Sequence, residues 1–160
     1  MKNTKAALKW ITEILNDNAI PFQITGGFAA RLYGSNRPLY DIDLEISDND
    51  FEKLTPFVKG YLFYGPDRSK DETFDILLMT LEYKGQLIDI SGANTDMLYN
   101  KEAKRWESCN TDITQAVEME VYNLRVPVAT WQSLLEYKKR AARPTDLEDV
   151  KNIERMMSNK

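Results

Sequence analysis

The stretch TGGFAARLYGSNRPLYDIDLEI, residues 25–46, combines a glycine pair with two aspartates one residue apart. In its last eight residues, LYDIDLEI, acidic and apolar side chains alternate strictly from Asp41 onward. Period-two alternation is typical of a β-strand with one buried face. The pattern therefore predicts a strand over residues 39–46. Its two faces are predicted to carry different side chains: Leu39, Asp41, Asp43 and Glu45 on one, and Tyr40, Ile42, Leu44 and Ile46 on the other.

The aspartate pair on this strand predicts a metal site. Side chains at positions i and i+2 share a face and are spaced roughly 6–7 Å apart along the strand. Two carboxylates held so close repel each other, and the repulsion raises the pKa of one of them. Mg²⁺ relieves such repulsion because it takes carboxylate oxygens, and it usually keeps substrate phosphates in its shell. The alternative is that Asp41 and Asp43 lie on the solvated face of an edge strand.

The glycine pair predicts a phosphate-binding turn. Gly26 and Gly27 stand between a short predicted strand, which contains Phe22 and Ile24, and the helix-forming residues 28–34. A helix N-terminus presents free N–H groups and the positive end of its dipole, and both favour phosphate. Glycine also lets the backbone approach a ligand closely. The simpler interpretation is an ordinary glycine turn.

A third carboxylate is needed for a two-metal site or a general base. Asp89, in LIDIS, lies between apolar neighbours in a predicted strand. A buried aspartate in such a place is costly unless it has a partner. We therefore predict that Asp89 joins Asp41 and Asp43. Glu45 is a weaker candidate, and a solvent-facing position in a hairpin remains the alternative for Asp89.

Periodicity and turn residues predict the remaining elements. Helices are predicted over 5–16 and 48–58, strands over 61–64, 74–83, 86–91, 116–122 and 124–129, and two helices that begin at Thr130 and Pro144. Residues 65–72 are predicted as a polar loop and residues 92–114 as irregular. This order predicts an α+β fold with a mixed sheet, packed helices and a C-terminal helical pair. We expect one domain over residues 1–160, with a core at about 20–129 and C-terminal helices at about 130–158.

Composition excludes several function classes. The chain has no histidine and a single cysteine, Cys109. Ser–His triads, an internal disulfide and most zinc sites are therefore excluded, and acid–base chemistry falls to carboxylates, Lys or Tyr. The net charge of −4 disfavours general binding of nucleic acids. Neither a P-loop nor a dinucleotide-binding glycine motif is found. No apolar run suits a signal peptide or a membrane span, so we expect a cytoplasmic protein without membrane contact.

Residues 25–46 resemble the signature of the DNA polymerase β-like nucleotidyltransferase superfamily, in which a glycine pair at a helix start precedes an Asp-x-Asp strand and a later acid. Small bacterial members, such as the lincosamide and other antibiotic nucleotidyltransferases, are the most similar. The tail LLEYKKRAARPTDLEDVKNI, residues 134–153, resembles the superfamily's late Lys-x(4)-Arg-x-x-Asp-Leu-x-Asp segment. The residues that match that segment are Lys138, Arg143, Asp146 and Asp149.

This resemblance implies Mg²⁺-dependent transfer of a nucleoside monophosphate from a nucleoside triphosphate, such as ATP, to a hydroxyl acceptor. The acceptor would be a small molecule such as an antibiotic, or a protein. One or two Mg²⁺ ions would lie on Asp41, Asp43 and Asp89, and Asp89 would also serve as general base.

The same resemblance implies that Gly26 and Gly27 hold the triphosphate, while Arg37 and Lys138 neutralise its charge. The Arg-x-Thr that often precedes Asp-x-Asp is replaced here by residues 37–40, and no acceptor-binding motif is recognisable. An alternative from another class is a catalytically inactive protein of this fold that binds a nucleotide or a protein partner. The nucleotide base, the acceptor and the oligomeric state are not specified.

Overall fold

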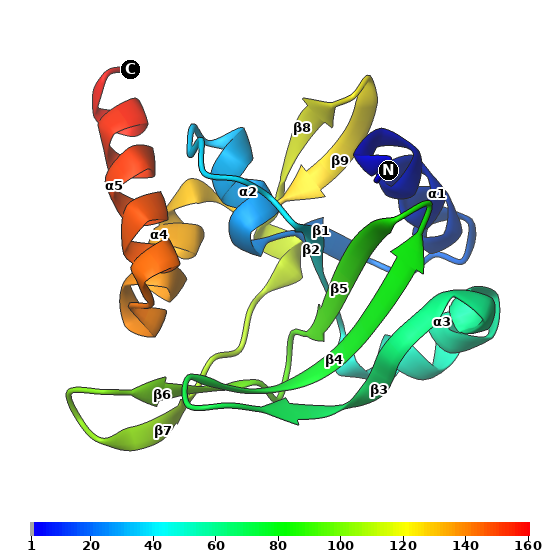
Figure 1. Cartoon of the computed structure of the whole chain (residues 1–160), viewed down its shortest axis with the longest axis horizontal. Helices are drawn as coiled ribbons and strands as arrows, with labels where there is room; N and C mark the ends of the chain where they lie inside the picture. Colours follow the sequence, from blue (N-terminus) through cyan, green and yellow to red (C-terminus); the bar gives the residue numbers. More distant parts are fainter. Residues whose placement is uncertain (1) are drawn as a thin grey trace.

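The computed structural model describes residues 2–160. Within this range nine strands form one mixed sheet, in the order β7-β6-β4-β5-β2-β1-β9-β8, with β3 paired on β4 (Figure 1). The pairs β2–β5 and β1–β9 are parallel, and the other pairs are antiparallel. The strands are β1 Phe22–Ile24, β2 Asp41–Ile46, β3 Leu62–Lys70, β4 Phe74–Tyr83, β5 Gln86–Gly92, β6 Met97–Asn100, β7 Arg105–Ser108, β8 Val117–Val121 and β9 Leu124–Val128.

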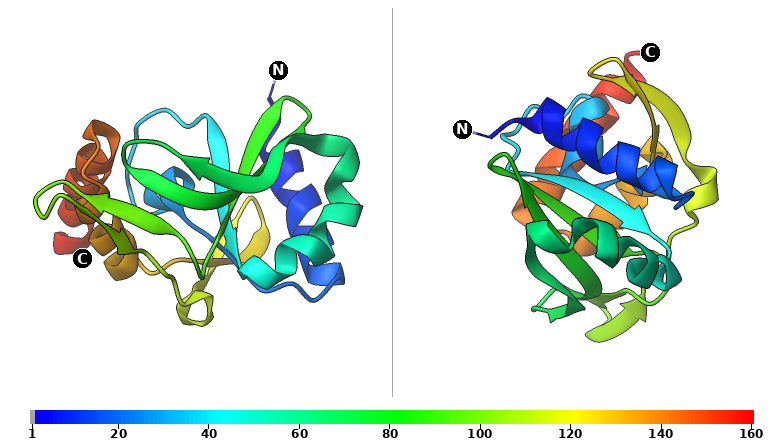
Figure 2. Two further views of the ribbon diagram at one scale, coloured as in Figure 1. Left: turned by 90° about the horizontal axis from the view of Figure 1, so that it is seen from below. Right: turned by 90° about the vertical axis from the view of Figure 1, so that its right-hand side faces the viewer.

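Five α-helices of the described range pack around the sheet, which confirms the predicted α+β class and its C-terminal helical pair. α4 and α5 lie at one end of the molecule, and α1 and α3 lie at the other (Figures 1 and 2). Their bounds are α1 Thr4–Asp17, α2 Gly26–Leu32, α3 Phe51–Val58, α4 Trp131–Ala141 and α5 Pro144–Ser158. Short 3₁₀ turns, at Asp48–Asp50, Lys59–Tyr61 and Ile113–Gln115, connect other elements.

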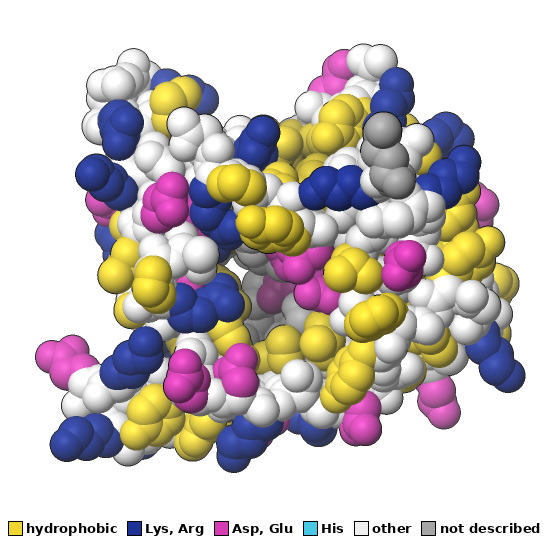
Figure 3. All heavy atoms as spheres, viewed as in Figure 1, with side chains coloured by type: hydrophobic (Ala, Val, Ile, Leu, Met, Phe, Trp, Pro, Cys, Tyr) yellow, Lys and Arg dark blue, Asp and Glu magenta, His cyan; other side chains and the backbone are white. Residues whose placement is uncertain are grey.

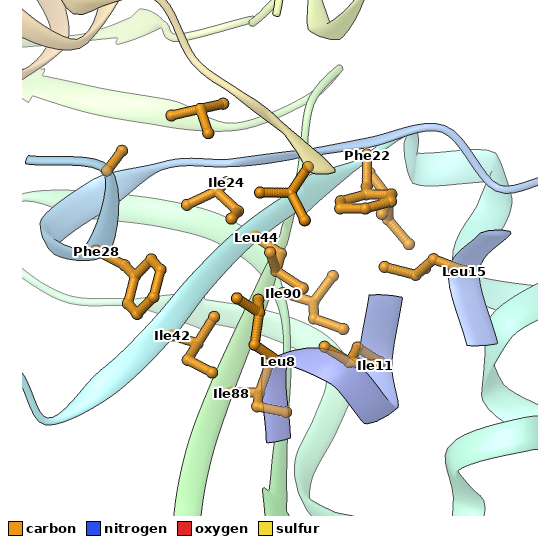
Figure 4. Packing of buried hydrophobic residues seen from close by; sticks show 14 of the residues in the cluster. Leu8, Ile11, Leu15, Phe22, Ile24, Phe28, Ile42, Leu44, Ile88 and Ile90 are labelled. Atoms are coloured by element: carbon orange, nitrogen blue, oxygen red, sulfur yellow. The ribbon is translucent and has the colours of Figure 1, made fainter. Parts of the chain in front are cut away.

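The core explains why β2 is oriented as it is. Residues of α1 face the apolar side of β2 and β5 (Figure 4). The fully buried side chains in this contact include Leu8, Ile11, Ile42, Leu44 and Ile88. Burying one such side chain contributes about 1.5–3 kcal/mol. Because side chains alternate along a strand, this burial directs the acids of β2 to the opposite face.

Several predicted boundaries are confirmed. β8 and β9 form the predicted hairpin, with Tyr122 and Asn123 at φ 51° and 66°, the left-handed conformation of a two-residue hairpin turn. Thr130 accepts a hydrogen bond from the N–H of Ser133 at 3.2 Å and caps α4. α5 begins at Pro144, where a missing N–H costs no helical bond. Of the helices in residues 2–160, none has both the length and the apolar character needed to cross a bilayer.

The predicted loops were wrong in two places. Residues 65–70 belong to β3, and the segment predicted as irregular contains β6 and β7. These strands carry mostly exposed or partly exposed side chains, so they lack the apolar alternation that marks a strand in sequence. β3 pairs through its backbone with β4, and β6 pairs with both β4 and β7. Their conformation is therefore set by strand partners.

The start of β2 also differs from its prediction. The strand begins at Asp41, so the alternation does not extend to Leu39 and Tyr40. Tyr40 is 74% exposed, whereas Leu39 packs partly against the core. The carbonyl of Leu39 accepts a hydrogen bond from Lys2 at 2.5 Å. Both residues precede the first paired residue of β2, so sheet geometry does not fix the direction of their side chains. Leu39 therefore packs toward the core and Tyr40 faces outward, the opposite of the predicted orientations.

Candidate active site

Three aspartates meet on the face of the sheet opposite α1. β2 and β5 run parallel, and their register places Asp43 directly beside Asp89. Asp41 lies two residues before Asp43 on the same face. One carboxylate oxygen from each of the three residues lies within 4.8 Å of the others. The structure thus brings together the three predicted acids, which form a cluster of oxygen donors.

This proximity has an electrostatic cost. Burial, followed by the charges of Asp41 and Asp89, raises the pKa of Asp43 to about 7. Burial also raises the pKa of Asp89, although a hydrogen bond from Thr80 partly counteracts it. The Thr80 hydroxyl donates to Oδ1 of Asp89 at 2.6 Å. The cluster is therefore destabilised as three free carboxylates, and a cation would relieve it.

Glu45 shares the face of the aspartates but lies outside their cluster. Its carboxylate accepts hydrogen bonds from the Gln23 amide at 2.7 Å and the Thr111 hydroxyl at 3.2 Å. Burial raises its pKa. The structure therefore places Glu45 at the next position along the cleft, apart from the three aspartates.

The glycine pair lies against Asp43. The N–H of Gly27 donates to Oδ2 of Asp43 at 3.0 Å, so the first turn of α2 faces that carboxylate. Gly26 has φ +60°, and a Cβ built on it would lie 2.6 Å from the same oxygen. A Cβ on Gly27 would lie 2.5 Å from Nη2 of Arg37. Both positions therefore exclude a side chain because functional groups of the cleft occupy the space.

We expect Gly26→Ala to destabilise the protein by at least about 1–2 kcal/mol, the cost of a left-handed conformation for a residue with a Cβ. Displacement of Asp43 adds to this cost. The measurement is urea unfolding followed by circular dichroism. Gly60→Ala is the matched control, because a Cβ there would have no neighbour within 4 Å. Equal unfolding free energies for the two variants would contradict the steric argument.

A wall of basic side chains faces the aspartates from the loop after α2 and from the C-terminal helices. Lys138 is 1% exposed. Its Nζ contacts Oδ2 of Asp149 at 2.9 Å and Oδ1 of Asp146 at 3.3 Å. Arg37 donates to both carboxylate oxygens of Asp149, at 2.8 and 2.9 Å. Arg143 donates to Oδ2 of Asp146 at 2.7 Å. The sequence motif of the tail is thus an ion-pair network that fixes the wall.

The charge of Asp149 makes part of the stability depend on pH. Burial alone would raise its pKa, but hydrogen bonds from Arg37, Ser35 and Lys138 more than offset burial and lower the pKa. A carboxyl group whose pKa is lower when folded contributes stability that is complete above its unfolded pKa, near 4, and is lost as the pH falls through its folded value.

We therefore expect Asp149→Asn to lower the unfolding free energy much more at pH 7 than at pH 2.5. Urea titrations of both proteins at a series of pH values measure this difference. A difference that stays constant with pH would show that the Asp149 charge contributes nothing to folding.

The aspartates and the basic wall line one cleft of about 330 Å³. Figure 3 shows the hollow between the C-terminal helices and the sheet, with acidic side chains inside it and Lys and Arg side chains on the helical side. All predicted site residues line it: Gly26, Gly27, Arg37, Asp41, Asp43, Asp89 and Lys138.

The cleft also contains residues that the sequence analysis did not select. The apolar side chains among them include Phe74, Ile76 and Leu78 of β4. Asp96, in the segment between β5 and β6, also lines the cleft. Alternation in β4 could have indicated its inward-facing side chains. No sequence signal marked Asp96, because its surroundings have the pattern of an irregular segment.

Cys109 also lines the cleft. It is partly buried, and burial raises the pKa of its thiol to about 11. The thiol is therefore protonated at neutral pH, as expected for a small apolar residue without a nucleophilic role.

No family model and no curated protein matches the sequence. Solved structures do match its backbone over nearly the whole length. A provisionally assigned nucleotidyltransferase from Thermotoga maritima has a TM-score of 0.70 at 15% identity, over 97% of this chain and 92% of its own. The lincosamide antibiotic adenylyltransferase LnuA, bound to lincomycin, has a TM-score of 0.62 at 13% identity, over 98% and 99% of the two chains.

A third match is ANT(2″)-Ia in complex with adenylyl-2″-tobramycin, with a TM-score of 0.59 at 17% identity, over 98% of this chain and 94% of that one. These identities are too low to transfer an activity, but the agreement in backbone covers both chains almost completely. The strand order, the C-terminal helical pair and these matches together show that the chain has the nucleotidyltransferase fold.

Proposed function

We propose that this protein is a Mg²⁺-dependent nucleotidyltransferase that moves a nucleoside monophosphate from a nucleoside triphosphate to a hydroxyl acceptor. The observation that carries the proposal is the meeting of three carboxylates within 4.8 Å, beside a glycine turn and opposite a basic wall. Such a site combines ligands for a divalent cation with donors for phosphate. LnuA is named an adenylyltransferase, and ANT(2″)-Ia was solved in complex with adenylyl-2″-tobramycin. Both support ATP as the donor.

The residues fit Mg²⁺. Asp41, Asp43 and Asp89 supply only oxygen ligands, and in the described chain their mutual repulsion is not balanced by a direct salt bridge. Hard divalent cations prefer such ligands. When bound there, Mg²⁺ would offset charge on the triphosphate and on the attacking oxygen.

The protein residues have separate roles in this proposal. Arg37, Lys138 and Arg143 attract the triphosphate toward the turn at Gly27. Asp89 accepts the proton of the acceptor hydroxyl, whose oxygen forms a bond to the α-phosphorus while the bond from that phosphorus to pyrophosphate breaks. Thr80 holds the Asp89 carboxylate in place. Catalysis is then mainly positioning and charge neutralisation, as in phosphoryl transfer generally, and needs no histidine.

The proposal extends to the setting of the protein. We propose that residues 1–160 act as one domain in the cytoplasm, on a small-molecule or protein acceptor. The three aspartates favour catalysis over a purely binding role, because a protein that only binds a partner does not need a repulsive carboxylate cluster.

Incubation with triphosphates labelled at the α-phosphate, Mg²⁺ and a panel of hydroxylated small molecules and proteins tests the proposal. Transfer of the label with release of pyrophosphate is the expected result. Binding of the triphosphate without transfer to any acceptor would favour the non-catalytic alternative.

We expect Thr80→Val to weaken divalent-cation binding by about 10–100-fold, the usual effect of removing a group that orients a metal ligand. The substitution keeps the shape of the side chain but removes the hydrogen bond to Asp89. Titration calorimetry with Mn²⁺ measures the affinity. Thr55→Val is the control, because Thr55 bonds only to the carbonyl of Phe51 in α3. Equal Mn²⁺ affinities of the two variants would show that Thr80 does not support the cation site.

A further inference from the structure

Asp96 has an unusual position at the end of the cleft. On one edge of β4, pairing with β5 reaches Leu78 and pairing with β6 begins at Asp75. Asp96 fills the gap, where its Oδ1 accepts the N–H of Leu77 at 3.0 Å. The residue is 6% exposed. Within residues 2–160 no donor reaches its other oxygen, although the side chain lines the cleft. One hydrogen bond would be met equally well by a neutral amide, so the charge of Asp96 has no structural task.

The charged groups around Asp96 make this end of the cleft negative. Burial raises the pKa of Asp96 to about 7, the charges of Asp48 and Glu45 add to the rise, and the charge of Arg68 opposes it. Arg68 is already engaged, because its guanidinium donates to Asp75 and to Thr95. In the described chain no cation pairs directly with Asp96 or Glu45. The second oxygen of Asp96 is open to the cleft, where it can accept a hydrogen bond from a charged N–H donor of a ligand.

An apolar wall connects this end of the cleft to the aspartate cluster. Thr80 pairs with Asp89 in the sheet. Leu77, three residues before Thr80 on β4, donates its N–H to Asp96. That interval corresponds to about 10 Å of strand. Leu78, within this interval, and Ile76, one residue beyond Leu77, line the cleft. The wall therefore offers apolar contact between a reacting group at Asp89 and a charged group at Asp96.

We propose that the Asp96 end of the cleft binds a positively charged amine of the acceptor, with its reacting hydroxyl about 10 Å away at Asp89. Asp96 is the main partner of this amine, and Glu45 is a second acid next to it. The proposal rests on nucleotidyl transfer as the function and names the class of acceptor: a small hydroxylated molecule that carries an amine.

The arrangement favours the acceptor over the nucleotide as the occupant. Arg37, Lys138 and Arg143 form the opposite wall, and their three charges exceed the two of their partners Asp146 and Asp149. The triphosphate is therefore drawn there and is repelled from Asp96. The acceptor oxygen, in contrast, must reach Asp89, where the apolar wall begins.

A pair of matched probes tests the proposal by NMR titration. One probe is a seven-carbon amino alcohol with its hydroxyl and amine at opposite ends, and the other is the seven-carbon diol. Mg²⁺ and a non-hydrolysable triphosphate are present, so that the aspartate cluster does not itself attract the amine. The N–H of Leu77, which bonds to Asp96, reports binding at the proposed place. We expect the amino alcohol to bind at least about tenfold more tightly than the diol.

Asp96→Asn should remove this preference while the bond to Leu77 remains, since the amide oxygen still accepts it. Glu45→Gln should reduce the preference less. Equal affinity of the two probes for the wild type would overturn the proposal, even if Asp96→Asn failed to fold. Unchanged discrimination in a folded Asp96→Asn variant would also overturn it.

The same titration in the Asp41→Asn/Asp43→Asn variant without nucleotide shows whether amine binding is independent of the aspartate cluster, and triphosphate binding by the wild type tests the proposed function separately. Amine preference in this variant, together with a wild type that neither binds the triphosphate nor transfers its label, would support the amine site and count against the proposed function. Triphosphate binding and label transfer without amine preference would support the proposed function and overturn the amine site.

Discussion

Replacing Asp41 and Asp43 together with asparagine is expected to lower nucleotidyl transfer by about a thousandfold or more. A bound metal stabilises transition-state charge by several kcal/mol, and each 1.36 kcal/mol corresponds to about a tenfold change in rate. Asparagine has the same shape as aspartate but no charge to hold the cation. The same variant should lose Mg²⁺-dependent binding of a non-hydrolysable triphosphate in titration calorimetry.

The folded state provides the control for this variant. Burial and the neighbouring carboxylates raise the pKa of Asp43, which shows that the cluster is repulsive. Removing two of its charges should therefore leave thermal stability unchanged or increase it. Glu82→Gln, an exposed acid on β4, should keep full activity and binding. Full triphosphate binding by the double variant would exclude the aspartates as the metal site, and a marked fall in its melting temperature would mean that activity was lost through misfolding.

Asp149→Asn is expected to reduce the free energy of unfolding by about 3–5 kcal/mol at neutral pH, the usual cost of removing one partner of a buried ion pair. Asp149 is fully buried and compensates both Lys138 and Arg37. With asparagine in its place, these cations keep only part of their compensation in a site that water hardly reaches. Urea unfolding monitored by circular dichroism measures the loss.

The chain offers a matched control on the same two helices. Lys139 of α4 pairs with Glu154 of α5 at 2.6 Å, but both side chains are about half exposed. Exposed pairs contribute about 0–1 kcal/mol, so Glu154→Gln should unfold almost like the wild type. If Asp149→Asn and Glu154→Gln had equal effects, the C-terminal helices would not depend on the buried network. The basic wall of the cleft would then need another explanation for its fixed position.

Local sequence patterns predicted most of the fold because burial has a period. The alternation of Ile42, Leu44 and Ile46 located β2, and the apolar spacing in residues 5–16 located α1. The polar strands β3, β6 and β7 were mostly not predicted, because their backbones pair with β4 or with each other while their side chains mostly face solvent. Tyr40 was oriented wrongly since it lies just outside the first ladder pair.

The sequence by itself determined two of the three acids of the proposed metal site and the glycine turn beside them. Asp41 and Asp43 share a face through strand geometry alone, and Gly26 and Gly27 mark the turn beside them. The tertiary structure decided the rest. Parallel pairing of β2 with β5 brings Asp89 to Asp43, and packing of α4 and α5 creates the ion pairs that fix Arg37 and Lys138. Asp96 reaches the cleft at the part of the β4 edge that pairs with neither β5 nor β6. Such contacts join residues far apart in the chain, so no local periodicity encodes them.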